Sequence, residues 1–357
     1  MPSVRDQVLL AGLTTLGVGG PARRFVRAGT EAELTAAVRD ADQRAEPLLI
    51  LGGGSNLVIA DAGFPGTVVQ VATRGLDQSA DPAEPDAVRL TVAAGEDWDG
   101  VVASCVAAGL SGLECLSGIP GLTGATPIQN VGAYGQEVAE VITTVRVYDR
   151  ATGEVTELAG LDCGFGYRTS MFKRDGSGRR VVLAVTFRLR PSELSGPVRY
   201  AELARSLGVP EGGQAPLTAV REAVLALRRG KGMVLDPADP DSRSAGSFFT
   251  NPVLDDAQFA ALQKLAGADV PIPRFPAGPG QVKVPAAWLI GQAGFGKGYP
   301  GRAGGARISS KHTLALVNPG GATAADIAGL AREIRDQVSD QLGVDLACEP
   351  ILVGLTL

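Results

Sequence analysis

The sequence predicts an α+β protein of two or three domains. Its 357 residues exceed the length that one hydrophobic core usually supports. Two segments in the first half combine a predicted helix with a glycine-rich loop, whereas the middle third holds strands in hairpin order, as in a mixed sheet. A hydrophobic content of 45% with 20% charged residues is typical of a globular protein.

The first predicted helix spans residues 30–44, because Thr30-Glu-Ala-Glu33 has the pattern of a capping box. The apolar run 47–51 is expected to be a short strand. It leads directly into three consecutive glycines, so this segment has the order helix, strand, loop.

The second segment has a helix from about Trp98 that Gly109 can end, and then a glycine-rich stretch. Alternating apolar residues predict strands at 145–149 and 155–158, around a turn, and another strand at 181–189. Later features are a helix at 217–229, a Pro- and Asp-rich boundary loop through Asp241, glycine-rich stretches at 278–285 and 291–305, a helix at 324–342, and an apolar tail at 348–357 that could add a strand to an earlier sheet.

The two glycine-rich loops suit a ligand that carries phosphate. Phosphate needs several converging backbone N–H groups, and glycine lets the chain curl tightly and approach closely. The loop Leu51-Gly-Gly-Gly-Ser-Asn56 follows a strand, and residues 117–135 supply a second surface with polar amides. The first loop matches neither the dinucleotide fingerprint nor the P-loop pattern.

Charge and composition exclude several classes of partner. The net charge of −5 opposes non-specific binding to nucleic acid or anionic lipid. We found no secretion signal and no apolar run of membrane-spanning length, so we expect a soluble, cytoplasmic protein that acts as a monomer. The four cysteines lack metal-ligand spacing and are expected to be buried free thiols, and His312 is the only histidine, so no metal site is predicted.

Six motifs stand in the order seen in one enzyme family: LGGGSN, SGIPGLTGATPIQNVGAYGQE, GYRTSMFK, GSFFTNP, AAWLIGQ and SSKH. From Thr15 to Glu349 the chain resembles the MurB-type UDP-N-acetylenolpyruvoylglucosamine reductases, and Tyr200 suggests their type I. The resemblance implies non-covalent FAD held by two α+β subdomains of the PCMH/vanillyl-alcohol-oxidase-like fold, with a C-terminal α/β substrate domain. It divides the chain into subdomain 1 (1–71 with 347–357), subdomain 2 (72–232) and the substrate domain (233–346).

The implied reaction uses NADPH to reduce FAD, which then reduces the enolpyruvyl group of a UDP-sugar. Hydride from flavin N5 adds to C3, and negative charge develops at C2 and on the adjoining carboxylate. Ser247 corresponds to the family's proton donor, and Arg168 to an arginine whose planar fork suits a carboxylate. Glu349 corresponds to the acid that acts with this arginine. Pro350 is expected to remove a backbone donor from the strand after Glu349.

The resemblance also assigns residues to binding. The expected FAD contacts are Leu51, Gly52, Gly53, Gly54, Ser55, Asn56, Gly118, Ile119, Pro120, Gly121, Gly124, Ala125, Gln129, Asn130, Gly132, Ala133 and Tyr134. The expected substrate contacts are Tyr167, Tyr200, Lys231, Asn251, Lys283 and Gln292, where Lys231 matches only if residues 232–235 are an insertion. For His312 we expect a structural, hydrogen-bonded role.

Two other functions remain open from the sequence. One is a different FAD-dependent oxidase or dehydrogenase on the same scaffold. Many of these attach flavin covalently through an early histidine or cysteine, whereas this chain has no histidine before residue 312. The other is a nucleotide-binding protein without catalysis, which substrate-dependent oxidation of NADPH would exclude.

Overall fold

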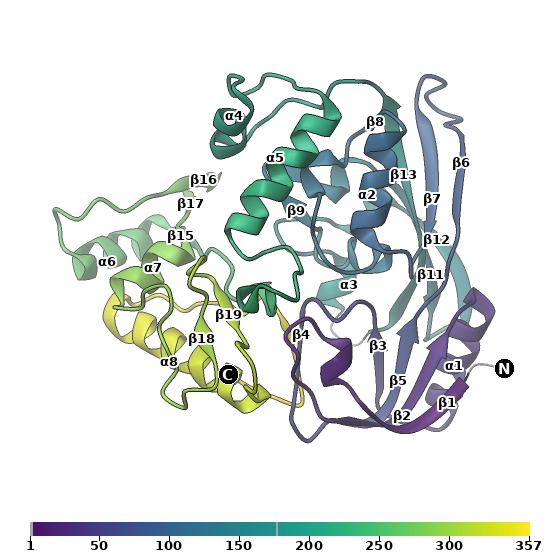
Figure 1. The fold of residues 1–357 in the computed structure, drawn as a ribbon, viewed down its shortest axis with the longest axis horizontal. Helices are drawn as coiled ribbons and strands as arrows, with labels where there is room; N and C mark the ends of the chain where they lie inside the picture. Colours follow the sequence, from purple (N-terminus) through teal and green to yellow (C-terminus); the bar gives the residue numbers. More distant parts are fainter. Residues whose placement is uncertain (1–2, 176–177) are drawn as a thin grey trace. The chain divides into compact units, whose positions relative to one another are not determined.

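The computed structural model describes residues 3–175 and 178–357, and these form two compact units (Figure 1). The first unit takes its described residues from Met1–Val8, Ala22–Gly53 and Pro65–Gly230. The second takes Leu9–Pro21, Gly54–Phe64 and Lys231–Leu357. Each unit is therefore assembled from segments that are far apart in the sequence.

Among its described residues, the first unit contains the short antiparallel ladder of β9 (Gly132–Ala133) with β10 (Gln136–Glu137) and two larger sheets. In one the strand order is β1-β2-β5-β3, with β3 parallel to β5. In the other the order is β12-β11-β13-β7-β6, all antiparallel, and β8 pairs with one end of β13. The strands are β1 (Ser3–Leu9), β2 (Pro21–Ala28), β3 (Leu48–Leu51), β5 (Phe64–Val71), β6 (Leu76–Ala80), β7 (Val88–Ala93), β8 (Leu110–Ser111), β11 (Ile142–Asp149), β12 (Glu154–Ala159) and β13 (Arg180–Pro191).

Helix α1 begins and helix α2 ends at the predicted signals. Thr30 Oγ1 accepts a hydrogen bond from the Glu33 N–H (3.2 Å) at the start of α1, and Gly109, with φ of +67°, follows α2. Figure 1 shows α2 and α5 side by side. The helices are α1 (Glu31–Gln43), α2 (Trp98–Ala107), α3 (Met171–Arg174), α4 (Ala201–Leu207) and α5 (Leu217–Gly230).

The second unit contains two small antiparallel sheets, β14-β19-β18 and β15-β17-β16, and one parallel pair, β4 with β20. The pair confirms that the C-terminal tail adds a strand to an earlier segment. The strands are β4 (Leu57–Ile59), β14 (Ser244–Ser247), β15 (Val253–Asp255), β16 (Phe275–Gly278), β17 (Gln281–Lys283), β18 (Arg307–Ile308), β19 (Ala315–Val317) and β20 (Ile351–Val353). The helices are α6 (Asp256–Ala266), α7 (Ala286–Gln292) and α8 (Ala324–Leu342).

Each unit has its own hydrophobic core. In the first, Trp98 of α2 packs on Phe187 of β13, with ring centroids 5.8 Å apart. In the second, Phe248 and Phe249 are fully buried and meet edge to face. Among the described residues, none of the helices is long and apolar enough to cross a membrane.

Candidate functional site

The two glycine-rich loops come into contact within the first unit. A Cβ placed on Gly53 would lie 2.8 Å from Gly121 Cα, so only glycine allows this approach. Gly124 is equally confined, because its Cβ would lie 2.5 Å from Ala94 Cβ. The sequence predicted that both loops serve one ligand, and the structure brings residues 51–53 and 118–124 together.

The second glycine loop is tied to the start of α2. The Trp98 N–H donates to Gly121 O (3.1 Å), and the Gly118 N–H donates to Asp99 Oδ1 (2.6 Å). Arg221 of α5 forms a two-point ion pair with the same carboxylate, at 2.6 and 2.9 Å. Burial alone would raise the pKa of Asp99, but hydrogen bonds from Arg221 and Gly118 hold it below its ordinary value. The ionised Asp99 therefore links the loop to two helices.

Asn130 organises the loop at residues 129–135. Its side chain is buried, and its Nδ2 donates to Glu137 Oε2 (2.7 Å) and to Gly166 O (3.2 Å). Its Oδ1 accepts from the Ala139 N–H (3.1 Å). These contacts use both the NH₂ group and the carbonyl oxygen of the amide. The geometry therefore favours a role for Asn130 in shaping the loop over direct contact with a cofactor.

Arg168 lies at the tip of a tight turn beside this loop. Gly166 and Thr169 exchange backbone hydrogen bonds of 3.0 and 3.1 Å across the turn. Arg168 has a φ of +53°, a left-handed conformation that is uncommon outside glycine. Its Nη2 donates to Gly132 O (2.9 Å), which orients the guanidinium over the predicted FAD loop.

Aromatic rings and a second arginine surround the same region. Tyr134 meets Tyr200 edge to face, with centroids 5.4 Å apart, and Tyr167 lies under the guanidinium of Arg168. Burial lowers the pKa of Arg228, whose charge also interacts with Tyr134, Asp99 and Arg168. Sequence reasoning missed Arg228. The signal for it is its position seven residues after Arg221 on one face of α5.

Ser247 ends β14 in the second unit. It faces Ala315 of β19, and the next residue, Phe248, donates its N–H to Leu314 O (2.7 Å). The pairing is irregular between Ser244 and Ser247, where Gly246 has a φ of +75°. Ser247 is only partly buried, in line with the requirement that a proton donor be reachable.

Glu349 lies next to the Ser247 segment. Its N–H donates to Phe248 O (2.9 Å), so the predicted proton donor and acid occupy adjacent backbone segments. Asn56 Nδ2 donates to Glu349 O (3.4 Å), and Asn56 O accepts from the Ile351 N–H (2.9 Å). Pro350 precedes β20, so the strand after Glu349 pairs with β4 from its first residue and loses no hydrogen bond there.

The other predicted substrate residues of the second unit lie on four separate segments. Asn251 Oδ1 accepts from the Ala286 N–H (2.9 Å) at the start of α7. Lys283 lies in β17, opposite Val253 and Phe275. Gln292 is exposed at the end of α7, and Lys231 is the first residue of the third segment of this unit.

The predicted site residues thus form two groups. Arg168, Tyr167 and Tyr200 belong with the predicted FAD loops to the first unit, whereas Ser247 and Glu349 belong with Asn56 to the second. That the two groups meet on one substrate stays a prediction. The described residues contain no group of three metal-ligating side chains.

The residues of the first unit fit FAD. Gly53 is exposed where it meets Gly121, so backbone of the first loop is accessible to a pyrophosphate, which needs N–H donors, and Arg168 and Arg228 supply positive charge beside the loops. Tyr134 adds an aromatic surface, and burial raises its pKa to about 12, which keeps its hydroxyl neutral. Backbone donors, cations and an aromatic ring are the groups that a flavin dinucleotide requires.

Comparison with known proteins agrees with this fit. Residues 22–159 match the FAD binding domain family, and residues 237–353 match the family of the UDP-N-acetylenolpyruvoylglucosamine reductase C-terminal domain. The chain is 57% identical over 359 residues to the UDP-N-acetylenolpyruvoylglucosamine reductase of Thermobifida fusca, covering 99% of each chain. It is 58% identical over 349 residues to the enzyme of the same name from Salinispora arenicola, covering 98% of this chain and 95% of the relative.

A solved structure is similar over the same length. The crystal structure of UDP-N-acetylenolpyruvylglucosamine reductase (MurB) from Thermus caldophilus superposes with a TM-score of 0.67 at 27% identity, covering 99% of this chain and 100% of that one. Together with the family matches, this confirms the predicted α+β class, with an FAD-binding domain followed by a distinct C-terminal domain.

Proposed function

Because the chain belongs to the UDP-N-acetylenolpyruvoylglucosamine reductase family, we propose that it reduces UDP-N-acetylglucosamine enolpyruvate to UDP-N-acetylmuramate with electrons from NADPH. It is an FAD-dependent oxidoreductase of peptidoglycan synthesis. The observation that carries the detailed proposal is the hydrogen bond between the Glu349 N–H and Phe248 O, which fixes an acid beside the segment of Ser247.

The first unit holds the cofactor in this proposal. The loops at 51–53 and 118–124 would bind the pyrophosphate of FAD, and the loop at 129–135 would contact the flavin end. When bound, FAD supplies the hydride that C3 of the enolpyruvyl group receives. Asp99 and Arg221 keep the Gly118 end of its loop in place.

Ser247 donates the proton that completes the reduction. Hydride addition at C3 leaves negative charge at C2, and the Ser247 hydroxyl transfers its proton to this carbon. A hydroxyl is a weak acid, but the enolate that it protonates is a strong base. The buried rings of Phe248 and Phe249 anchor the strand end on which the hydroxyl lies.

Arg168 and Glu349 act on the substrate carboxylate. The guanidinium of Arg168 stabilises the charge that spreads from C2, and its hydrogen bond to Gly132 O fixes its plane beforehand. Glu349 shares a proton with the same carboxylate. Tyr200 is 44% exposed at the start of α4, and in this proposal it contacts the diphosphate of the UDP-sugar.

An anaerobic reoxidation experiment tests the proposed function. The purified protein should be yellow, NADPH should bleach it, and the UDP-enolpyruvyl sugar should restore the colour without oxygen. A reduced flavin that only oxygen reoxidises would refute the reductase and favour an oxidase.

Ser247→Ala tests the assignment of the proton donor. Flavin reduction by NADPH should stay nearly intact, whereas substrate reduction should slow by several powers of ten, each worth about 1.4 kcal/mol of barrier. The two half-reactions are measured separately by stopped-flow absorbance. An equal loss in both would mean that the substitution damages the fold and not proton transfer.

A further inference from the structure

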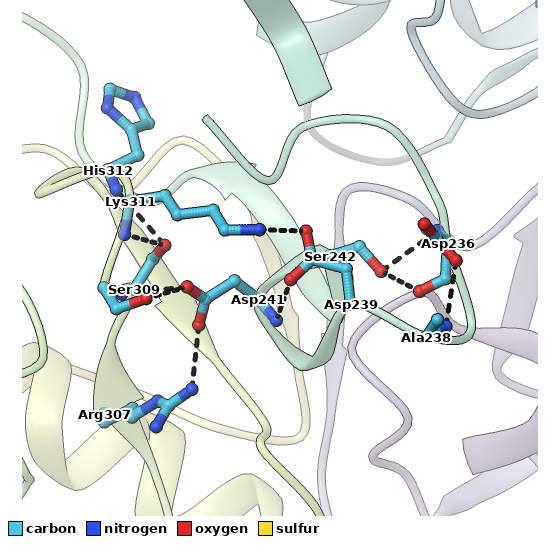
Figure 2. Close-up of polar contacts among 10 residues, drawn as sticks. Asp236, Ala238, Asp239, Asp241, Ser242, Arg307, Ser309, Lys311 and His312 are labelled. Carbon is cyan, nitrogen blue, oxygen red and sulfur yellow. Dashed lines mark hydrogen bonds and ion pairs between the residues drawn. The ribbon is translucent and has the colours of Figure 1, made fainter. Parts of the chain in front are cut away.

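Asp241 is a buried carboxylate in the second unit with partners from a distant segment (Figure 2). Its side chain is 2% exposed. Oδ1 accepts from Arg307 Nη2 (2.9 Å), and Oδ2 accepts from the Ser310 N–H (3.0 Å) and from the Ser310 hydroxyl. One carboxylate therefore joins the loop before β14 to the turn after β18.

A second contact joins the same two segments. Asp239 Oδ2 pairs with Lys311 Nζ (2.7 Å), while Asp239 Oδ1 accepts from the Asp241 N–H (3.1 Å). In Figure 2 the Asp239 carboxylate points toward Lys311, and the Asp241 carboxylate points toward Arg307 and the turn at 309–312. The ion pair is partly exposed and the Asp241 network is buried, so we expect Asp241 to contribute more to the connection.

The turn that Asp241 binds leads directly into the partner strand of Ser247. The buried Ser309 hydroxyl accepts from the N–H groups of Lys311 (3.0 Å) and His312 (3.2 Å), and this shapes the turn. His312 O then accepts from the Ala315 N–H (3.1 Å), and Ala315 O accepts from the Ser309 N–H (2.8 Å). Ala315 is the residue that faces Ser247.

The strand of Ser247 needs this connection because its own pairing is weak. Between β14 and β19 the register is matched at Ser244 and at Ser247 but shifts between them. An irregular ladder fixes the position of a side chain less firmly than a regular one. Asp241 lies six residues before Ser247, and Ser310 lies five residues before Ala315. The hydrogen bonds between Asp241 and Ser310 therefore join the two chain segments close to the point where Ser247 of β14 pairs with Ala315 of β19.

The charge of Asp241 is part of this arrangement. Burial alone would raise the pKa of Asp241, but the hydrogen bonds from Ser310 and Arg307 hold it below its ordinary value. The group is therefore ionised near neutral pH. Removing its charge leaves Arg307 without its anion in a partly buried setting, which costs more than removing an exposed ion pair.

We propose that Asp241 is a positioning residue for Ser247, because it fixes β14 against β19 and so sets where the Ser247 hydroxyl lies. This rests on the proposed function, in which Ser247 protonates C2. Displacement of a reacting group by about 1 Å can cost about a hundredfold in rate. Asp241 itself need not touch substrate or cofactor.

The test uses both half-reactions of the FAD-loaded full chain. Asp241→Asn should slow reoxidation by the UDP-enolpyruvyl sugar by roughly ten- to a hundredfold, and should change flavin reduction by NADPH less than about twofold. Asp336→Asn is the matched control. It removes an exposed carboxylate paired with Arg335 in the same unit and should change neither rate. Equal slowing of both half-reactions by Asp241→Asn would overturn the proposal.

A double-mutant cycle separates positioning from general loss of stability. If Asp241 acts through Ser247, the variant with both Asp241→Asn and Ser247→Ala should be no slower than Ser247→Ala alone. Additive losses would show that Asp241 acts elsewhere. Should Asp241→Asn fail to fold, Ser310→Ala is the alternative variant, because it removes only one hydrogen bond to Asp241 and changes an exposed residue. It should slow reoxidation by the sugar in the same way as Asp241→Asn but by a smaller factor.

Hydrogen exchange gives a readout that does not depend on turnover. The amide of Phe248, bonded to Leu314 O, should exchange faster in Asp241→Asn than in the parent chain, while amides of α8 should not change. Unchanged exchange at Phe248 would refute the positioning role. If Phe248 exchanges faster in Asp241→Asn but the parent chain does not reduce the sugar, the proposed function is wrong, whereas the role of Asp241 in holding β14 against β19 is supported.

Discussion

At the scale of single residues, the backbone of Arg168 stores strain beside the predicted substrate. A left-handed conformation costs a non-glycine residue roughly 1–2 kcal/mol, and here the Gly166–Thr169 turn and the bond to Gly132 O maintain it. Such strain is common where a side chain must point in one direction. Glycine at residue 168 would give the more stable backbone, whereas arginine supplies the guanidinium that the proposed reaction needs.

Two substitutions of Arg168 should separate these demands. Arg168→Gly and Arg168→Ala both remove the guanidinium and should slow substrate reduction by roughly 10- to 100-fold, the value of a charge-assisted hydrogen bond of about 1.5–3 kcal/mol. Only glycine relieves the strain, so Arg168→Gly should unfold at a higher temperature than Arg168→Ala. Equal melting temperatures in calorimetry would contradict the strain argument.

The cysteines allow another test at this scale. Burial raises the pKa of Cys105 and Cys115 to about 12 and that of Cys163 to about 11, while Cys348 is only partly buried. Because the thiolate is the reactive form, these three thiols should resist alkylation in the folded protein at a pH of about 8. Mass spectrometry should find Cys348 labelled first and the others only after unfolding. Rapid native labelling of Cys105 would show that α2 opens.

At the scale of elements, the clamp between α2, the second glycine loop and α5 has a measurable consequence. Asp99→Asn keeps an acceptor for the Gly118 N–H but loses the ion pair with Arg221, whereas Asp99→Ala loses both. FAD affinity should therefore fall in the order parent, Asn, Ala, by roughly tenfold for each 1.4 kcal/mol lost. Fluorescence titration of the apoprotein with FAD measures this order.

The control for this series is Asp97→Asn. Asp97 begins α2 and accepts from the Gly100 N–H, but it does not pair with Arg221. Asparagine is an equally good N-cap, so FAD affinity should not change. If Asp97→Asn weakened FAD as much as Asp99→Asn, the effect would come from the helix and not from the clamp.

Local sequence signals predicted most of the helices and strands, but the sequence did not predict which distant residues are in contact. The N-cap at Thr30, the glycine after α2 and the apolar tail that became β20 were correct, whereas the Glu33 carboxylate accepts from the Gly29 N–H (2.9 Å) and does not complete the predicted capping box. Helix α6 was missed although Asp255 and Gln258 form a capping box. The hairpin β16–β17 contains proline and glycine and lacks alternation, so its sequence resembles a loop.

The same limit applies to the candidate site. The glycine loops and Arg168 were found through motifs, but Asp99 and Asp241 bind partners 122 and 66 residues away. No spacing rule connects such residues, because the pairing follows from the packing of helices and strands. The Asp-rich segment before β14 was interpreted as a boundary loop, and its buried carboxylate became evident only from the structure.

At the scale of the whole molecule, lowered carboxylate pKa values predict how stability depends on pH. The pKa values of Asp99 in the first unit and Asp241 in the second lie below their ordinary value of about 3.9. A folded pKa below the unfolded one adds stability that is present above the unfolded pKa and lost as pH falls through the folded pKa. The melting temperature should stay level near neutral pH and fall below a pH of about 4.

The variant Asp241→Asn checks this assignment. It should melt lower than the parent chain near neutral pH, yet lose less stability between about pH 4 and pH 2, because one of the titrating groups is gone. Calorimetry between about pH 4 and pH 2 measures how steeply the melting temperature falls in the parent chain and in the variant. A steeper acid transition in the variant would mean that other carboxylates dominate.

The interleaving of the chain limits how the gene can be divided. Expression of codons 231–357 alone would omit Leu57–Ile59, the ladder neighbour of β20, and Asp61, whose carboxylate caps the first amides of α8. Such a truncation product should aggregate or be degraded, whereas co-expression with a separate polypeptide carrying residues 1–230 could restore a folded, flavin-loaded complex. For this scaffold, successful recombination between homologues therefore requires exchanging the discontinuous segments as one block.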